Sequence, residues 1–169
     1  MKLASFEAIV RVLNDANTHY LVVGGLAVAA HGYGRATFDV DIVLQLQPEN
    51  VHNALQALGS LGYKPFVPVK AIDFADPAIR KSWIEEKNMI VFQLYSEQHP
   101  ETRIDIFVAE PFDFDTEYTN ALIEEFIPGY SIRFVRIETL LQMKELAGRE
   151  KDMEDIRQLK ILMESSDNG

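Results

Sequence analysis

The chain has no cysteine, which excludes disulfide bonds and thiolate metal sites. It also has no apolar run close to the about 18 to 20 residues that a membrane span needs. The first residues, MKLASFEAIVRVLNDAN, mix charges with apolar side chains, which indicates an amphipathic helix and not a signal peptide. We therefore expect a cytoplasmic protein with no membrane partner.

Positive charge is scarce, because 16 Lys and Arg face 26 Asp and Glu and leave a net charge of −10. Proteins that bind nucleic acid through its phosphates normally show a basic footprint, and the chain as a whole lacks one. Many acids gather in 110–125, where a solvated face is the simplest interpretation. Bases concentrate between Lys144 and Lys160, so a local basic patch stays open.

The sequence also lacks internal repeats, and its 169 residues predict one compact domain, 1–169, with a helical C-terminal segment at about 137–164. Apolar spacing predicts helices at 4–14, 25–32, 48–62, 76–87 and after 137, with Gly148 dividing the last one. Strands are expected at 19–23, 38–46, 88–96, 102–110 and 131–137, and an edge strand or loop at 63–69. This order predicts an α/β (α+β) fold, a mixed sheet flanked by helices.

Two aspartates interrupt the strand FDVDIVLQL, and side-chain alternation places Asp39 and Asp41 on one face. Ionised carboxylates in a half-buried strand are costly unless a positive group compensates them. A divalent cation would do so, and hard oxygen ligands favour Mg²⁺ or Mn²⁺. The alternative is an exposed pair compensated by Arg35 or Arg103.

The dipeptide Gly24-Gly25 stands directly between a strand and a helix. Glycine there permits a sharp turn and a close approach by a ligand, and the following helix offers free N–H groups to a phosphate. A tight turn alone would also use two glycines. Neither the dinucleotide fingerprint nor a phosphate-binding Gly-Lys-Ser/Thr loop follows.

A third acid, Asp105, interrupts the apolar run RIDIFV in the same manner. With Asp39 and Asp41 it would supply the carboxylates of a metal-assisted phosphoryl or nucleotidyl transfer. A salt bridge to Arg103 is the structural alternative for this residue.

The pattern GGLAVAAHGYGRATFDVDIVL, followed by RIDIFV, resembles the nucleotidyltransferase superfamily typified by DNA polymerase β, and looks most like AbiEii-type toxin nucleotidyltransferases. The resemblance implies that Asp39, Asp41 and Asp105 bind metal and catalyse. It also implies that Gly24 and Gly25, with Arg35 and Thr37, hold the nucleotide phosphates.

The C-terminal MKELAGREKDMEDI is similar to a segment of that group in which a lysine precedes Arg-x-Lys-Asp and a further Asp. Lys144 would meet the triphosphate as a point charge. If the helix continued, Lys144, Lys151 and Asp155 would share one face. The roles of Arg149, Lys151, Asp152 and Asp155 stay open, and a merely solvated helix face is the alternative.

The resemblance implies Mg²⁺-dependent transfer of a nucleoside monophosphate from an NTP to an acceptor hydroxyl. The acceptor could be a small molecule, a protein or tRNA, and a toxin would pair with an antitoxin-like protein. The alternative is a catalytically silent module that binds a nucleotide or a partner on the same fold.

Overall fold

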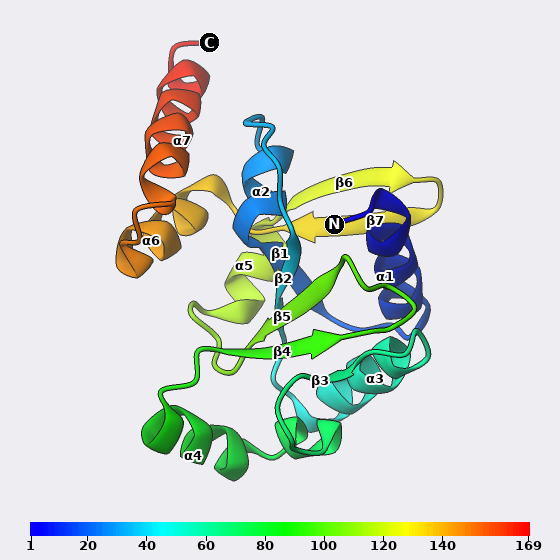
Figure 1. Ribbon diagram of the computed structural model, residues 1–169. Helices are drawn as coiled ribbons and strands as arrows, with labels where there is room; N and C mark the ends of the chain where they lie inside the picture. The colour runs from blue at the N-terminus through cyan, green and yellow to red at the C-terminus, as the bar shows by residue number, and fades with distance from the viewer.

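The computed structural model describes residues 1–169 and contains one seven-stranded sheet with helices around it (Figure 1). The strands are β1 Tyr20–Val23, β2 Asp39–Leu44, β3 Lys64–Pro65, β4 Val91–Tyr95, β5 Arg103–Phe107, β6 Leu122–Ile127 and β7 Tyr130–Phe134. The helices are α1 Leu3–Asp15, α2 Gly24–Ala30, α3 Pro48–Gly59, α4 Pro77–Lys87, α5 Phe114–Asn120, α6 Ile137–Ala147 and α7 Asp152–Asp167, with a short 3-10 turn, η1, at Ala71–Ala75. The predicted mixed α/β fold is confirmed.

The order of strands across the sheet is β3-β4-β5-β2-β1-β7-β6. The pairs β1–β2, β3–β4, β4–β5 and β6–β7 are antiparallel, whereas β2–β5 and β1–β7 are parallel. The expected antiparallel pair of β4 and β5 is therefore present, and the segment predicted as an edge strand or loop contains the short edge strand β3. The central position of β2 places its two aspartates in the middle of the sheet.

Alternation gives the sheet one apolar and one polar face around β2. Val40 and Ile42 are fully buried, as are their neighbours Ile104 and Ile106 on β5. Phe92 on β4 stacks with Phe74 of η1 and Trp83 of α4, at centroid distances of 5.0 and 5.3 Å. Figure 1 shows α1 and α3 close together on one side of the molecule, and α6 and α7 apart from them beyond α2. The face that carries Asp39, Asp41 and Asp105 is left partly open, and we call it the acid face.

The predicted division of the C-terminal helix at Gly148 is confirmed, whereas the acidic run 110–125 differs from the sequence-based expectation. Gly148 ends α6 with a φ of +60°, and α7 begins afresh at Asp152, so the helix does not continue and Lys151 lies between the two helices. The acidic run 110–125 is not simply a solvated face, because it forms α5 and the start of β6 and buries Glu117 against Arg136 and Thr139. None of the helices is both long and apolar enough to cross a bilayer.

Candidate nucleotidyl-transfer site

Asp41 and Asp105 lie side by side at the middle of the acid face. They are register partners in the parallel pair of β2 and β5, so their Cα atoms are about 4.8 Å apart, the usual strand spacing. Asp39 lies two residues earlier on the same face of β2, about 6.6 Å from Asp41 along the strand. The three predicted acids are therefore neighbours in space, although more than 60 residues separate the first from the last in the sequence.

Gln93 of β4 holds the third acid in place. It is the register partner of Asp105, and its amide nitrogen donates a hydrogen bond of 2.9 Å to Asp105 Oδ1. The other two carboxylates differ, because the side chains of Asp39 and Asp41 accept no hydrogen bond and form no ion pair with the protein. Two half-buried carboxylates without partners are costly in a folded chain and are a feature of functional sites.

Gly24 allows the Asp41 carboxylate to lie against the start of α2. Its φ is +65°, in the left-handed region that favours glycine. A Cβ at this position would also clash with the Asp41 side chain, whose Cγ would lie at 2.8 Å. Both the backbone conformation and the close contact require glycine here.

Gly25 brings two further predicted residues to the same turn. A Cβ on Gly25 would lie 2.9 Å from Thr37 Oγ1 and 3.1 Å from a terminal nitrogen of Arg35. Thr37 also donates a hydrogen bond of 3.3 Å to the carbonyl oxygen of Asp39, which fixes the chain just before β2. The glycine turn, the guanidinium, the hydroxyl and the aspartates thus form one cluster, which we call the acid–glycine cluster.

The electrostatics of this cluster favour a cation. Burial, and then the neighbouring Asp105 and Asp39, together raise the pKa of Asp41 to about 7, against the opposing effect of Lys144 and Arg149. The pKa of Asp105 is also raised, mainly by burial, although the hydrogen bond from Gln93 opposes the shift. The site therefore holds its negative charge at a cost, and a positive ligand would relieve that cost.

A buried ion-pair network connects the loop before β2 to the C-terminal helices. Arg35 pairs with Asp155 through two contacts of 2.8 Å, and Lys144 lies 2.9 Å from Asp155 and 3.2 Å from Asp152. Arg149 pairs with Asp152 at 2.7 Å. Asp152 and Asp155 are both 1% exposed, so full pairing is what makes their burial tolerable.

The network changes what Lys144 can do. Its ammonium group is already paired with two carboxylates, and the residue is 5% exposed. Direct contact with a triphosphate would require these pairs to open. Lys144 and Asp155 do meet, as the sequence suggested, but across the junction of α6 and α7 and not along one continuous helix.

The three acids do not by themselves form a metal cage. No group of three or more His, Asp or Glu side chains is arranged to hold a metal ion. The donor chemistry nevertheless fits Mg²⁺, which is usually bound through one or two carboxylates, with water and substrate phosphates completing its octahedron. The unpartnered carboxylates of Asp39 and Asp41 match that requirement.

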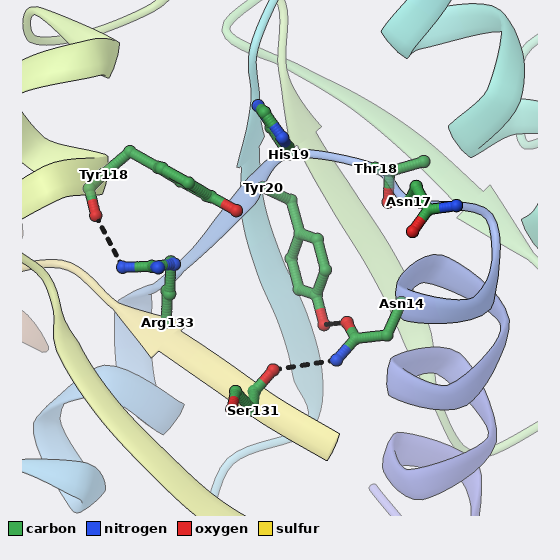
Figure 2. A pocket seen from close by; sticks show the side chains of 8 residues that line it. All are labelled: Asn14, Asn17, Thr18, His19, Tyr20, Tyr118, Ser131 and Arg133. Carbon is green, nitrogen blue, oxygen red and sulfur yellow. Dashed lines mark hydrogen bonds between the residues drawn. The ribbon is translucent and has the colours of Figure 1, made fainter. Parts of the chain in front are cut away.

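A well-defined pocket lies elsewhere, between the end of α1, β1, α5 and β7, with a volume of about 270 Å³ (Figure 2). Several of its polar groups are already paired: Tyr20 donates to Asn14, Asn14 donates to the Ser131 carbonyl, and Arg133 donates to the Tyr118 carbonyl, all at 2.8 to 2.9 Å. It contains none of the predicted site residues. A site for a nucleotide is better sought on the open acid face, where unpaired carboxylates lie.

Comparison with protein families gives one match over residues 2–167, to the family described as "Nucleotidyltransferase of unknown function (DUF6036)". The chain belongs to this nucleotidyltransferase family. The nucleotidyltransferase superfamily inferred from the Gly-Gly and Asp-x-Asp pattern is thus confirmed. The family match does not show the closer resemblance to AbiEii-type toxins. A search of curated proteins found no similar sequence.

Solved structures of antibiotic nucleotidyltransferases have the same fold as this chain. The lincosamide antibiotic adenylyltransferase LnuA, solved with lincomycin, is 16% identical with a TM-score of 0.58, over 96% of this chain and 98% of LnuA. The antibiotic-resistance factor ANT(2'')-Ia, in its solution structure, is 14% identical with a TM-score of 0.57, over 96% and 89% of the two chains. A complex of ANT(2'')-Ia with adenylyl-2''-tobramycin is 12% identical with a TM-score of 0.52, over 96% and 94%.

Sequence reasoning missed two parts of the site. Gln93 lies in an ordinary alternating strand, and only its register with Asp105 shows that it positions an acid. The buried pairing of Asp155 with Arg35 joins residues 120 positions apart, and a charged helix segment gives no signal for that contact.

Proposed function

We propose that this protein transfers a nucleoside monophosphate from an NTP to an acceptor hydroxyl, with Mg²⁺ or Mn²⁺ as cofactor. The observation that carries the proposal is the pair of unpartnered carboxylates, Asp39 and Asp41, on one strand face beside the Gly24 turn and Asp105. The family match supports this chemistry, and adenylyltransferases with the same fold provide a precedent for a hydroxyl-bearing acceptor.

In this proposal Asp39 and Asp41 hold the metal ion. When bound, the ion would neutralise the triphosphate and orient it for attack. Gly24 and Gly25 admit the phosphates close to the backbone, because a side chain at either position would collide with the residues around it. Arg35 and Thr37, which lie against Gly25, would contact the phosphate oxygens.

Asp105 has the position and the raised pKa of a general base. The acceptor oxygen would form a bond to the α-phosphorus while the bond from the α-phosphorus to the bridging oxygen of the β-phosphate breaks. Pyrophosphate would leave, and the hydroxyl proton would pass to Asp105, whose orientation Gln93 fixes. Lys144 would be a positioning residue, because its ion pair fixes Asp155, and Asp155 in turn fixes the guanidinium of Arg35.

The acceptor class is the open part of the proposal. The same-fold enzymes are named for antibiotics, which favours a small molecule, whereas a protein or tRNA acceptor would suit a toxin controlled by an antitoxin-like partner. All these acceptors are consistent with a cytoplasmic location, where NTPs are abundant. Incubation with each α-labelled NTP, Mg²⁺ and cell extract would show which fraction, small-molecule, protein or RNA, becomes labelled.

A silent module on the same fold is the competing hypothesis. It would bind an NTP in a Mg²⁺-dependent manner without moving label to any fraction. Calorimetric titration of the NTP, run beside the labelling reaction, separates the two. Binding without transfer in every fraction would contradict the catalytic proposal.

A further inference from the structure

The acid face continues past Asp105 toward the β3 edge of the sheet. Register places Gln93 opposite Asp105, and the Phe66 amide donates a hydrogen bond of 2.9 Å to the Gln93 carbonyl, which extends the β3–β4 pairing to Phe66. Phe66, Gln93, Asp105 and Asp41 therefore form one row across four strands. At the usual strand spacing, Phe66 lies about 10 Å from Asp105.

The neighbouring row on the same face adds a second ring and a cation. Lys64 is the register partner of Tyr95, and Arg103 that of Asp39. The Phe66 and Tyr95 rings meet edge to face at 6.0 Å, and the Arg103 guanidinium lies 5.5 Å from the centre of the Phe66 ring. We call Phe66, Tyr95 and Arg103 the aromatic platform.

Phe66 and Arg103 of this platform are exposed, and Tyr95 is half-buried beside them. Phe66 is 58% exposed, although phenylalanine is usually buried. Arg103 is also exposed and forms no ion pair with any carboxylate of the chain. An aromatic ring, a second ring set against it and a cation without an acidic partner thus lie beside the catalytic acids.

The core does not account for the platform. Phe92 and Leu94 are on the buried side of β4, where Phe92 stacks on Phe74 of η1 and Trp83 of α4, whereas Tyr95 and Phe66 lie on the other side of these strands. An exposed phenylalanine held by a neighbouring ring and a guanidinium presents a flat surface, which stacks well on planar groups.

We propose that the aromatic platform is the acceptor subsite, and that the acceptor is a small hydroxyl compound that carries a flat ring. This inference rests on the proposed function, because it places the reacting hydroxyl at Asp105. The about 10 Å between Asp105 and Phe66 then accommodates a molecule with its hydroxyl at one end and its flat ring at the other. Arg103 would stack on that ring or pair with an anionic substituent.

Charge favours a small acceptor over RNA. The chain carries a net charge of −10, and the platform offers only Arg103, with Lys64 beside it already 3.6 Å from Glu97. A polynucleotide needs many phosphate contacts for useful affinity, and two cations at this edge would supply few.

The test compares two probes that differ only in the ring, adenosine and ribose. The NTP site is first filled with Mg²⁺ and an NTP analogue whose α,β-bridging oxygen is a methylene group, so that the probes report on the acceptor side. Binding is followed by NMR titration. We expect adenosine to bind about tenfold more tightly than ribose, because stacking on exposed aromatic rings is tolerant of base identity.

Three variants locate the binding. Phe66→Ala should weaken adenosine about tenfold and leave ribose and the NTP analogue unchanged, whereas Phe66→Tyr should retain adenosine. Phe126→Ala is the matched control, because Phe126 is 61% exposed on β6 at the opposite edge of the sheet and should change nothing. Far-UV circular dichroism would confirm that each variant folds.

Equal binding of adenosine and ribose, or adenosine binding that Phe66→Ala leaves intact, would overturn the subsite. A tRNA whose binding depends on Phe66 while adenosine fails to bind would overturn the choice of a small acceptor. Failure of the proposed function would look different, because the wild-type protein would then show no Mg²⁺-dependent binding of the NTP analogue at all.

Discussion

The Asp41 carboxylate should destabilise the metal-free protein, and removing its charge should stabilise the fold. The pKa of this group rises from 3.8 to about 7 on folding, because it is buried next to Asp105 and Asp39. Since a tenfold change in proton affinity corresponds to about 1.4 kcal/mol, keeping the group ionised above pH 7 costs at most about 4 kcal/mol. Part of the side chain keeps contact with water, so we expect Asp41→Asn to raise the free energy of unfolding by about 2 kcal/mol at pH 8.

The pH dependence has a definite sign. The folded state binds the Asp41 proton between pH 4 and 7 more tightly than the unfolded state does, so stability falls as pH rises through this range. The advantage of Asp41→Asn should therefore be nearly absent at pH 4 and complete near pH 8. For a chain of this length, about 2 kcal/mol corresponds to roughly 4 to 8 °C in Tm.

The assay is thermal or urea unfolding in EDTA at pH 4, 6 and 8. The matched control is Asp152→Asn, which removes a buried carboxylate that does have partners, Lys144 and Arg149. This control should lose about 3 kcal/mol, because it leaves buried cations unpaired. If Asp41→Asn were as destabilising as Asp152→Asn at pH 8, the Asp41 carboxylate would be a stabilising structural group and not a strained one.

Other variants test separate parts of the account. Gly24→Ala should lower the free energy of unfolding by about 1 to 3 kcal/mol and weaken Mg²⁺ binding, because it places a Cβ against the Asp41 carboxylate at a φ of +65°. A variant with the stability and the Mg²⁺ affinity of the wild-type protein would contradict this close contact. Asp155→Asn should raise KM for the NTP more than it lowers kcat, because it frees Arg35, and the opposite split would argue against a phosphate-binding Arg35. Burial raises the pKa of Glu117, but the hydrogen bonds from Arg136 and Thr139 outweigh that effect and lower it. The ionised Glu117 should therefore stabilise the fold near neutral pH, and this stabilisation should be lost in acid. Glu117→Gln should flatten the pH–stability curve below pH 5, and an unchanged slope would exclude this contribution.

Local patterns were enough to predict the centre of the fold and of the site. Alternation in FDVDIVL placed Asp39 and Asp41 on one face, and the structure has them there, half-buried, while Val40 and Ile42 on the opposite face are fully buried. Gly24 was inferred from its place between a strand and a helix, and both its positive φ and its contact with Asp41 agree. These features depend on a few adjacent residues, so the sequence displays them directly.

Features that depend on long-range pairing could not be predicted in the same way. The acidic run 110–125 was expected to face solvent, but Glu117 is buried, because its carboxylate accepts hydrogen bonds from Arg136 and Thr139, about 20 residues further along the chain. Lys144 was predicted to bind phosphate, but in the structure Asp152 and Asp155 of α7 pair with its ammonium group. The aromatic platform exists only because β3 pairs with β4, a contact that the broken sequence YKPFVPV does not reveal.

In the proposed function, Asp39 and Asp41 serve the metal-assisted transfer of a nucleoside monophosphate. The most direct measurement incubates the protein with Mg²⁺, acceptor extract and one NTP labelled either at the α- or at the γ-phosphate, beside Asp39→Asn and Asp41→Asn. We expect the wild-type protein to move α-label into an acceptor and to release γ-label as pyrophosphate, and both variants to lose this transfer by at least about 100-fold. Release of γ-label as inorganic phosphate, or full transfer by Asp41→Asn, would contradict the proposed function.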